Sequence, residues 1–184
     1  MRFEPIDGTD LVLIHLTQHG DARGSFARVW CAYAFAEAGL SFQPVQANSS
    51  LTRGKGALRG MHLQRAPKPD AKLVRCTRGR VHDVTVDMRA SSTRFGHAFA
   101  VELSADPATA LFIPAGFAHG FQALAEEVVV EYLMGEYYDP ALADGFRYDD
   151  PAVAVRWPLP VTNLSDRDRD WPPLGTRLSH RNEL

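Results

Sequence analysis

Val84-Thr85-Val86-Asp87-Met88 and Phe99-Ala100-Val101-Glu102-Leu103 each place an apolar side chain at every second position. Side chains along a β-strand alternate between its two faces, so this period of two predicts a strand at each place. Other apolar runs predict strands at Leu11–Thr17, Leu111–Ile113 and Val128–Leu133. Strand signals dominate the chain, and we therefore expect a mainly β fold.

The 14 glycines and 12 prolines separate these runs with frequent turn signals. The clearest helix signal is the alanine-rich segment Ala32–Leu40, in which Gly39 is placed to end the helix. Short strands at this spacing are typical of an antiparallel sandwich or barrel with few short helices. Tight turns close a small barrel around a central cavity, and such a cavity is a natural ligand site.

The length of 184 residues favours one domain, so we predict a single domain over residues 1–184. Prolines and charged residues accumulate from Trp157 onward, and we predict an irregular tail over about residues 158–184. Trp157 and Trp171 should pack this tail near the domain, because a disordered segment rarely contains tryptophan.

The charge balance and the cysteine content exclude several classes of protein. Lysine and arginine total 20, aspartate and glutamate total 22, and the net charge of −2 argues against a nucleic acid polymer as partner. The chain has no apolar run long enough for a transmembrane helix, and its start lacks the apolar core of a signal peptide. Cys31 and Cys76 are too few for a disulfide scaffold. We expect a cytoplasmic protein with no membrane partner.

Two segments concentrate residues suited to chemistry. In Leu58-Arg59-Gly60-Met61-His62-Leu63-Gln64, the side chains of His62 and Gln64 point to the same face of a strand. Pro114-Ala115-Gly116-Phe117-Ala118-His119-Gly120 contains a further histidine. Together the segments resemble the two signature motifs of the cupin superfamily, whose small jelly-roll β-barrels often bind a metal through histidines. Gln64 stands where many cupins have a second histidine, and a carboxamide is a weak metal ligand.

These residues leave three interpretations of His62 and His119 open. The first is a packing or hydrogen-bonding role for both histidines. The second is a metal-dependent cupin that uses both as ligands. The third is a general base at His62 in a metal-free cavity, which requires a second group to orient the imidazole.

Candidate partners for such a base occur elsewhere in the chain. The tail contains Asp166, Asp168 and Asp170, although a charge run of this kind is by itself typical of a solvated loop. Lys72, at the start of a predicted strand, is a candidate cation for a developing oxyanion. Tyr132 lies inside the apolar run Val128–Leu133 and is either a core aromatic residue or a proton donor in a cavity wall.

Further motifs follow one another along nearly the whole chain, from Asp21 to about Leu174. They are Asp21–Phe26, Gln46–Ser50, Lys55–Gln64, Lys72–Arg75, Asp83–Asp87, Ile113–Phe121, Tyr132, Tyr137–Pro140, Asp149–Pro151 and Leu164–Asp168. In these motifs the chain resembles the dTDP-4-dehydrorhamnose 3,5-epimerase family, metal-free enzymes of deoxysugar biosynthesis with a cupin-type jelly-roll β-barrel. The resemblance implies epimerisation of a dTDP-4-keto-6-deoxyhexose at carbon 3, carbon 5 or both, in a dTDP-L-rhamnose-type pathway and without a metal or other cofactor.

The resemblance also implies roles for catalytic residues. His62 matches the base that removes the proton next to the keto group, and Asp168 matches the carboxylate that orients it. Lys72 matches the lysine that stabilises the enolate, and Tyr132 matches the acid that returns a proton to the opposite face. This chemistry needs two groups on opposite walls of a cavity and no redox cofactor.

The remaining matched residues suit a nucleotide diphosphate. The resemblance implies that arginines contact phosphate, that amides contact hydroxyl groups or base edges, that Phe26 stacks on a flat ring and that His119 donates to the sugar. It also implies a homodimer in which Arg23 and Phe26 complete the site of the partner subunit. The implied substrate-binding residues are Arg23, Phe26, Arg28, Gln46, Asn48, Arg59, Lys72, His119 and Arg167.

Two positions depart from the family pattern. Arg28 and Ala143 stand where the family usually has glutamates of the substrate-binding group. Asp144, next to Ala143, is a carboxylate that could compensate for the missing glutamate. Arg167 replaces a lysine of the family and keeps its positive charge. These changes leave a monofunctional 3- or 5-epimerase of a specialised deoxysugar pathway as an alternative. A non-catalytic sugar-nucleotide-binding domain is a further alternative.

Overall fold

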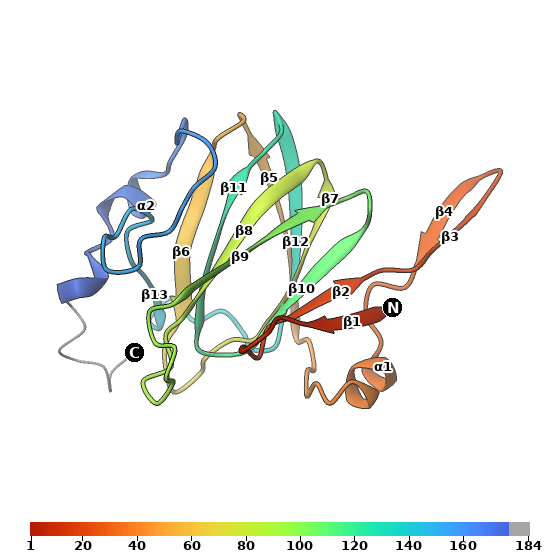
Figure 1. Cartoon of the computed structure of the whole chain (residues 1–184), viewed down its shortest axis with the longest axis horizontal. Coiled ribbons are helices and arrows are strands. Elements are labelled where there is room, and N and C mark those ends of the chain that lie inside the picture. The colour runs from red at the N-terminus through yellow and green to blue at the C-terminus, as the bar shows by residue number, and fades with distance from the viewer. Residues whose placement is uncertain (177–184) are drawn as a thin grey trace.

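Two antiparallel sheets pack face to face in the computed structural model, which describes residues 1–176 (Figure 1). Across the six-stranded sheet the order is β1 (Arg2–Pro5), β2 (Val12–His15), β10 (Thr109–Ile113), β7 (Lys72–Arg78), β12 (Glu127–Met134) and β5 (Gln46–Arg53). Across the five-stranded sheet the order is β13 (Ala143–Gly145), β6 (Leu58–Gln64), β11 (Phe117–Ala123), β8 (Arg80–Asp87) and β9 (Ala98–Ser104). The architecture confirms the expected mainly β fold.

All five strands predicted from apolar patterns are present. The two alternating segments lie in or directly beside β8 and β9, and the runs ending at Ile113 and Leu133 lie in β10 and β12. The run Leu11–Thr17 is shorter than predicted, because the chain turns at Leu11, whose carbonyl accepts a hydrogen bond from the Ile6 N–H at 3.0 Å. In β8 the polar side chains of Thr85 and Asp87 are also buried, since both faces of this strand are covered.

Three apolar clusters hold the sheets together. One lies between the sheets and includes Val74, Val81 and Val130. A second covers the outer face of the five-stranded sheet, where Phe146 and Leu174 of the C-terminal half pack on strand residues. The third covers the outer face of the six-stranded sheet and includes Val12, Ile14, Phe35, Phe42, Leu73, Ala110 and Phe112.

Helix α1 (Ala32–Glu37) begins at the predicted residue and ends before the predicted Leu40. Gly39 adopts φ of +74°, a conformation that glycine reaches without steric cost, and the Leu40 N–H donates to the Phe35 carbonyl at 2.8 Å. The predicted stop at Gly39 is therefore confirmed, but the helix is three residues shorter than expected because the cap occupies its last turn.

The C-terminal segment contains more regular structure than the sequence suggested. Helix α2 (Asp166–Asp170) and a 3₁₀ turn, η1 (Leu174–Thr176), interrupt a segment predicted to be irregular. Ser165 caps α2, since its hydroxyl accepts a hydrogen bond from the Asp168 N–H at 3.1 Å. The indole of Trp157 donates to the Tyr148 carbonyl at 2.9 Å, which confirms the expected packing of that tryptophan. Residues 177–184 of the predicted tail lie outside the described residues.

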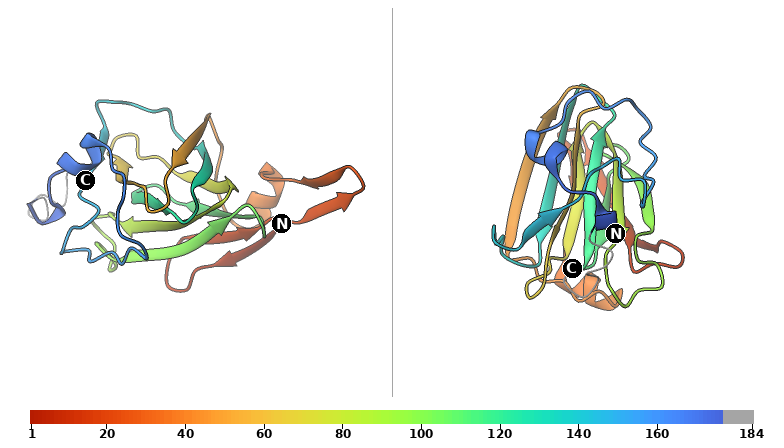
Figure 2. Two further views of the ribbon diagram at one scale, coloured as in Figure 1. Left: turned by 90° about the horizontal axis from the view of Figure 1, so that it is seen from above. Right: turned by 90° about the vertical axis from the view of Figure 1, so that its left-hand side faces the viewer.

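A separate hairpin, β3 (Gln18–Asp21) and β4 (Gly24–Ala27), projects away from the two sheets (Figure 2). Its side chains are almost all exposed, and Phe26 is 68% exposed. No apolar pattern predicted this hairpin, because neither strand has a buried face. Among residues 1–176 no helix has the length and hydropathy to cross a membrane.

Phe35 tests the packing of α1 on the six-stranded sheet. Its ring is fully buried and contacts the rings of Phe3, Phe42 and Phe112 at centroid distances of 5.3, 5.9 and 6.1 Å. Phe35→Ala should lower the free energy of unfolding by about 3–5 kcal/mol, as measured by urea denaturation, because it leaves a cavity in an aromatic cluster. Tyr33 on the same helix is 85% exposed, so Tyr33→Ala should change stability by less than about 0.5 kcal/mol. Equal effects of the two changes would contradict the described packing.

Candidate active site

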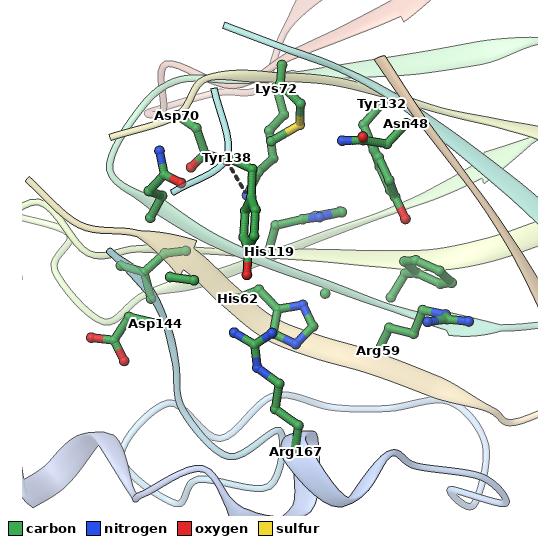
Figure 3. Close-up of a pocket in the computed structure, with 16 residues that line it drawn as sticks. Asn48, Arg59, His62, Asp70, Lys72, His119, Tyr132, Tyr138, Asp144 and Arg167 are labelled. Atoms are coloured by element: carbon green, nitrogen blue, oxygen red, sulfur yellow. Dashed lines mark ion pairs between the residues drawn. The ribbon is translucent and has the colours of Figure 1, made fainter. Parts of the chain in front are cut away.

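A cavity of about 260 Å³ opens between the two sheets. β6 and β11 of the five-stranded sheet supply Arg59, His62 and His119, while β7 and β12 of the six-stranded sheet supply Lys72 and Tyr132. Figure 3 shows these side chains around one space, with Arg167 of α2 approaching from the side opposite Lys72. The barrel therefore brings together residues that are far apart in the sequence.

The close approach of β6 and β11 places the two histidines next to each other. His62 and His119 are cross-strand partners, and the register of this pair of strands shifts between His119 and Phe121. Gly60 has φ of +135°, and a Cβ at this position would lie 2.6 Å from the Cα of Gly120. Glycine is therefore required at position 60 both for its backbone conformation and for the contact between the strands.

His62 forms a hydrogen-bonded pair with the carboxylate predicted to orient it. Its Nε2 lies 2.6 Å from Oδ1 of Asp168, whose side chain is 5% exposed, while the His62 side chain is 42% exposed. Nδ1 of His62 makes no hydrogen bond with residues 1–176. When Nε2 carries the proton and donates a hydrogen bond to Asp168, Nδ1 is unprotonated. Nδ1 is then the ring nitrogen that can accept a proton in the cavity.

The surroundings of Asp168 keep its carboxylate charged. Burial alone would raise the pKa of the Asp168 carboxyl, but the interaction with His62, chiefly the hydrogen bond, acts in the opposite direction. The Gly60 N–H, which donates to Oδ2 at 3.4 Å, adds to this effect, and the pKa lies below its ordinary value. A solvated loop, as the charge run alone would suggest, is therefore the wrong description of this segment at Asp168.

His119 forms a second histidine–carboxylate pair inside the barrel. Its Nε2 lies 2.8 Å from Oδ2 of Asp83 on β8. The side chains of His119 and Asp83 are 8% and 0% exposed, so this pair is buried much more deeply than that of His62.

Lys72 and Tyr132 approach the cavity from the six-stranded sheet. The ammonium of Lys72 is almost fully buried and lies 3.3 Å from Oδ2 of Asp70. The Tyr132 hydroxyl donates to Oγ of Ser50 at 2.8 Å. Burial raises the pKa of the Tyr132 phenol, and the hydrogen bond to Ser50 offsets only part of this increase. Tyr132 is thus a protonated phenol at a cavity wall rather than only a core aromatic residue.

The mouth of the cavity carries polar and cationic groups. The guanidinium of Arg59 donates to Oγ1 of Thr52 at 2.8 Å, and the guanidinium of Arg167 lies over the ring of Trp171 at 5.1 Å. Asn48 lines the cavity and accepts a hydrogen bond from Gln46 at 3.0 Å.

A model of the dTDP-4-dehydrorhamnose 3,5-epimerase family matches residues 6–176. The chain belongs to this family. It is therefore an isomerase of the epimerase class, and its two sheets form the jelly-roll barrel expected from the cupin-like motifs.

The similarity to individual dTDP-sugar epimerases covers almost all of the chain. A dTDP-4-dehydrorhamnose 3,5-epimerase of Methanothermobacter thermautotrophicus is 41% identical over 92% of this chain and 91% of its own. A dTDP-4-dehydrorhamnose 3-epimerase of Streptomyces niveus is 36% identical over 92% of this chain and 82% of its own. The solved structure of a dTDP-6-deoxy-D-glucose-3,5-epimerase from Legionella pneumophila, in complex with dTDP-4-keto-L-rhamnose, covers 98% of this chain and 96% of its own at 33% identity and a TM-score of 0.91.

Three residues expected to bind substrate lie away from the cavity of their own chain. Arg23 and Phe26 are on the projecting hairpin, and Arg28 follows it. Arg23 is exposed and pairs with Asp21 at 2.6 Å, and none of the three lines the cavity. Ala143, at the position of the second expected glutamate, does line the cavity beside Asp144.

Sequence reasoning assigned no role to several residues that the fold brings to the cavity. Tyr138 lines the cavity and is 54% exposed, and its backbone N–H donates to Oε1 of Gln46 at 3.1 Å. Asp70 and Asp83 pair with Lys72 and His119. The position of Asp70, two residues before Lys72, was a usable signal, whereas nothing local marks Asp83 as the partner of His119.

Gln64 has a structural role at the position where cupins have a second histidine. Its amide donates to the carbonyls of Lys68 and Tyr137, at 2.7 and 3.1 Å, and accepts from the Asp139 N–H at 2.9 Å. Within residues 1–176, no group of three or more His, Cys, Asp or Glu side chains is arranged to hold a metal ion.

Proposed function

We propose that this enzyme epimerises a dTDP-linked 4-keto-6-deoxyhexose by removing a proton next to the keto group, with His62 as the base. The hydrogen bond between His62 and Asp168 is the observation that carries this proposal. It occupies Nε2 and leaves Nδ1 of His62 to take the proton, and the charged carboxylate stabilises the imidazolium that then forms. The family and the relatives that act on dTDP-4-dehydrorhamnose support the substrate class.

The keto oxygen becomes negatively charged as the proton leaves, and Lys72 is proposed to stabilise it. As the C–H proton moves to His62, its electron pair forms a carbon–carbon double bond and the carbonyl electrons move to oxygen. A buried ammonium stabilises such an oxyanion more strongly than a solvated one, because little water screens it. The nearby Asp70 holds the ammonium in place.

Tyr132 is proposed to return a proton to the opposite face of the planar enolate. It comes from the six-stranded sheet, whereas His62 comes from the five-stranded sheet, so the two groups lie on different walls of the cavity. Its raised pKa keeps the phenol protonated near neutrality, as an acid requires. Inversion at a carbon follows when the base removes a proton from one side and the acid delivers one from the other.

The nucleotide is proposed to lie across the mouth of the cavity. Arg59 and Arg167 suit the diphosphate, Gln46 and Asn48 suit hydroxyl groups or a base edge, and His119 contacts the sugar. Tyr138 presents an exposed ring on which the pyrimidine could stack. With Ala143 in place of a glutamate, this edge of the cavity lacks one carboxylate that the family usually has.

A deuterium-exchange experiment tests the proposed reaction. Incubation with a dTDP-4-keto-6-deoxyhexose in deuterated water, followed by NMR, should show deuterium next to the keto group. Deuterium at carbons 3 and 5 supports a double epimerase, and deuterium at one carbon supports a monofunctional enzyme. His62→Asn should slow the exchange by about 100-fold or more, because an amide is not a base.

The control for this change is His97→Asn, which alters an exposed histidine that does not line the cavity. It should exchange at the wild-type rate. No exchange at either carbon with folded wild-type protein would reject the chemistry and leave a binding domain. Loss of exchange on chelation, with stoichiometric metal in the purified protein, would instead support the metal-dependent cupin.

Tyr132→Phe separates proton removal from proton return. His62 is 42% exposed, so a deuteron from solvent can replace the proton on Nδ1 and return to the same face without the acid. Net epimerisation should therefore fall by about 100-fold while exchange at the first carbon changes by less than about threefold, both followed by NMR. Tyr137→Phe, a change at an exposed tyrosine outside the cavity, is the matched control. Equal losses of exchange and epimerisation in Tyr132→Phe would contradict this division of roles.

We further propose that residues 1–184 form a single domain and that two copies form a homodimer. In this dimer each chain would complete the active site of the other. The β3–β4 hairpin, which carries Arg23 and Phe26, projects from the barrel, and neither residue lines the cavity of its own chain (Figure 2). The outer face of β5, β12 and β7 has a hollow of about 320 Å³ lined in part by Val29, Leu73 and Leu133, which suits a second copy of the chain.

Mixing two inactive variants tests whether the sites are shared. Arg23→Ala and His62→Asn chains, refolded together in equal amounts, should regain about one quarter of the wild-type activity, since half of the dimers are hybrids with one intact site. Each variant refolded alone is the control. Activity no higher than the mean of the two variants would show that Arg23 acts within its own chain or not at all.

A further inference from the structure

The two histidines of the cavity share one hydrogen-bonding pattern in different surroundings. Each donates a hydrogen bond from Nε2 to a carboxylate oxygen, at 2.6 Å in the His62 pair and 2.8 Å in the His119 pair. The His62 side chain is 42% exposed, whereas His119 is 8% exposed and its partner Asp83 is fully buried. The two histidine–carboxylate pairs, on adjacent strands, therefore differ mainly in how strongly water screens their charges.

Asp83 is a buried carboxylate with few groups to balance its charge. It lies on the inward face of β8, and its Oδ1 makes no hydrogen bond with the described residues. Its one ion pair within residues 1–176 is with His119. Burying a charged carboxylate without a counter-charge is very costly, so the arrangement is stable when His119 carries a positive charge.

The other charged groups around His119 are compatible with this assignment. Lys72, which lines the same cavity, is paired with Asp70. Tyr132 is neutral, since burial raises the pKa of its phenol and the charge of Asp83 adds to this. Cys76, between the sheets, is also a neutral thiol, because burial and the charge of Asp83 raise its pKa to about 11.

A doubly protonated His119 has one N–H left for a ligand. Nε2 is occupied by Asp83, and Nδ1 makes no hydrogen bond with the described part of the chain. Because His119 lines the cavity, Nδ1–H is available to a hydrogen-bond acceptor there.

We infer that Asp83 is a positioning residue that keeps both ring nitrogens of His119 protonated, so that Nδ1–H donates to the keto oxygen as this oxygen gains negative charge. The inference rests on the proposed function for the identity of the acceptor. No proton leaves His119 in this step: the C–H proton goes to His62, the carbonyl electrons go to oxygen, and His119 and Lys72 stabilise the oxyanion. His62 and His119 then have opposite tasks, base and donor, although both pair with a carboxylate.

Nitrogen-15 NMR of the histidine rings in the full-length wild-type protein at pH 7 tests the protonation directly. His119, assigned by comparison with His119→Asn, should show both ring nitrogens protonated. In Asp83→Asn it should become neutral, with one unprotonated nitrogen. A neutral His119 in the wild-type protein would overturn the inference, and this measurement needs no variant at Asp83 that might fail to fold.

Kinetics of Asp83→Asn test the role in the reaction. The contact strengthens only as charge develops on the oxygen, so kcat should fall by about 100-fold while KM changes by less than about threefold. Thr85→Val is the matched control: Thr85 is buried on the same face of β8, and its hydroxyl has no hydrogen-bond partner within residues 1–176. It should keep the wild-type kcat and the NMR signature of His119.

The kinetics of Asp83→Asn and the deuterium exchange of the wild-type protein test different claims. An unchanged kcat in folded Asp83→Asn would overturn the role of Asp83. Absence of deuterium exchange in the wild-type protein would reject the proposed reaction, and with it the identity of the acceptor, while the NMR result would still decide the protonation of His119.

Discussion

The hydrogen bond between His62 and Asp168 joins two residues that are 106 positions apart, and the proposed active site depends on it. β6 alone leaves the histidine without an orienting group, and α2 alone leaves Asp168 as one acid in a charged turn. The two meet because the C-terminal segment crosses the outer face of the five-stranded sheet, where Phe146 and Leu174 pack on apolar strand residues. Apolar packing behind the sheet therefore brings the carboxylate to the histidine.

The face-to-face arrangement of the sheets suits a reaction that needs two opposed groups. The proposed base belongs to the five-stranded sheet, and the proposed acid, Tyr132, belongs to the six-stranded sheet. Side chains of both sheets that point inward meet in one cavity, with apolar residues such as Val74 and Val130 filling the rest of the interior. The barrel thus provides opposite walls, and among residues 1–176 α2 is the only helix with a residue that lines the cavity.

Close ion pairs in the cavity, rather than the net charge of the chain, determine the electrostatics of the proposed site. The net charge of −2 predicted the absence of a nucleic acid partner but gave no information about the cavity. There Lys72 pairs with Asp70 and His119 pairs with Asp83, at distances of 3.3 and 2.8 Å and with little exposure to water. Short separations in a poorly screened interior matter more than the sum of charges over the surface.

The sequence by itself determined the β-strands and the stop at Gly39, because apolar periodicity and glycine conformation are local properties. Its motifs, through their resemblance to a family, also suggested His62, Lys72, Tyr132 and Asp168 as candidate catalytic residues. Only the tertiary structure paired His119 with Asp83, placed Tyr138 at the cavity mouth and left Arg23 and Phe26 on a hairpin that points away from it. These features depend on strand register and on contacts between distant segments, which no short stretch of sequence specifies.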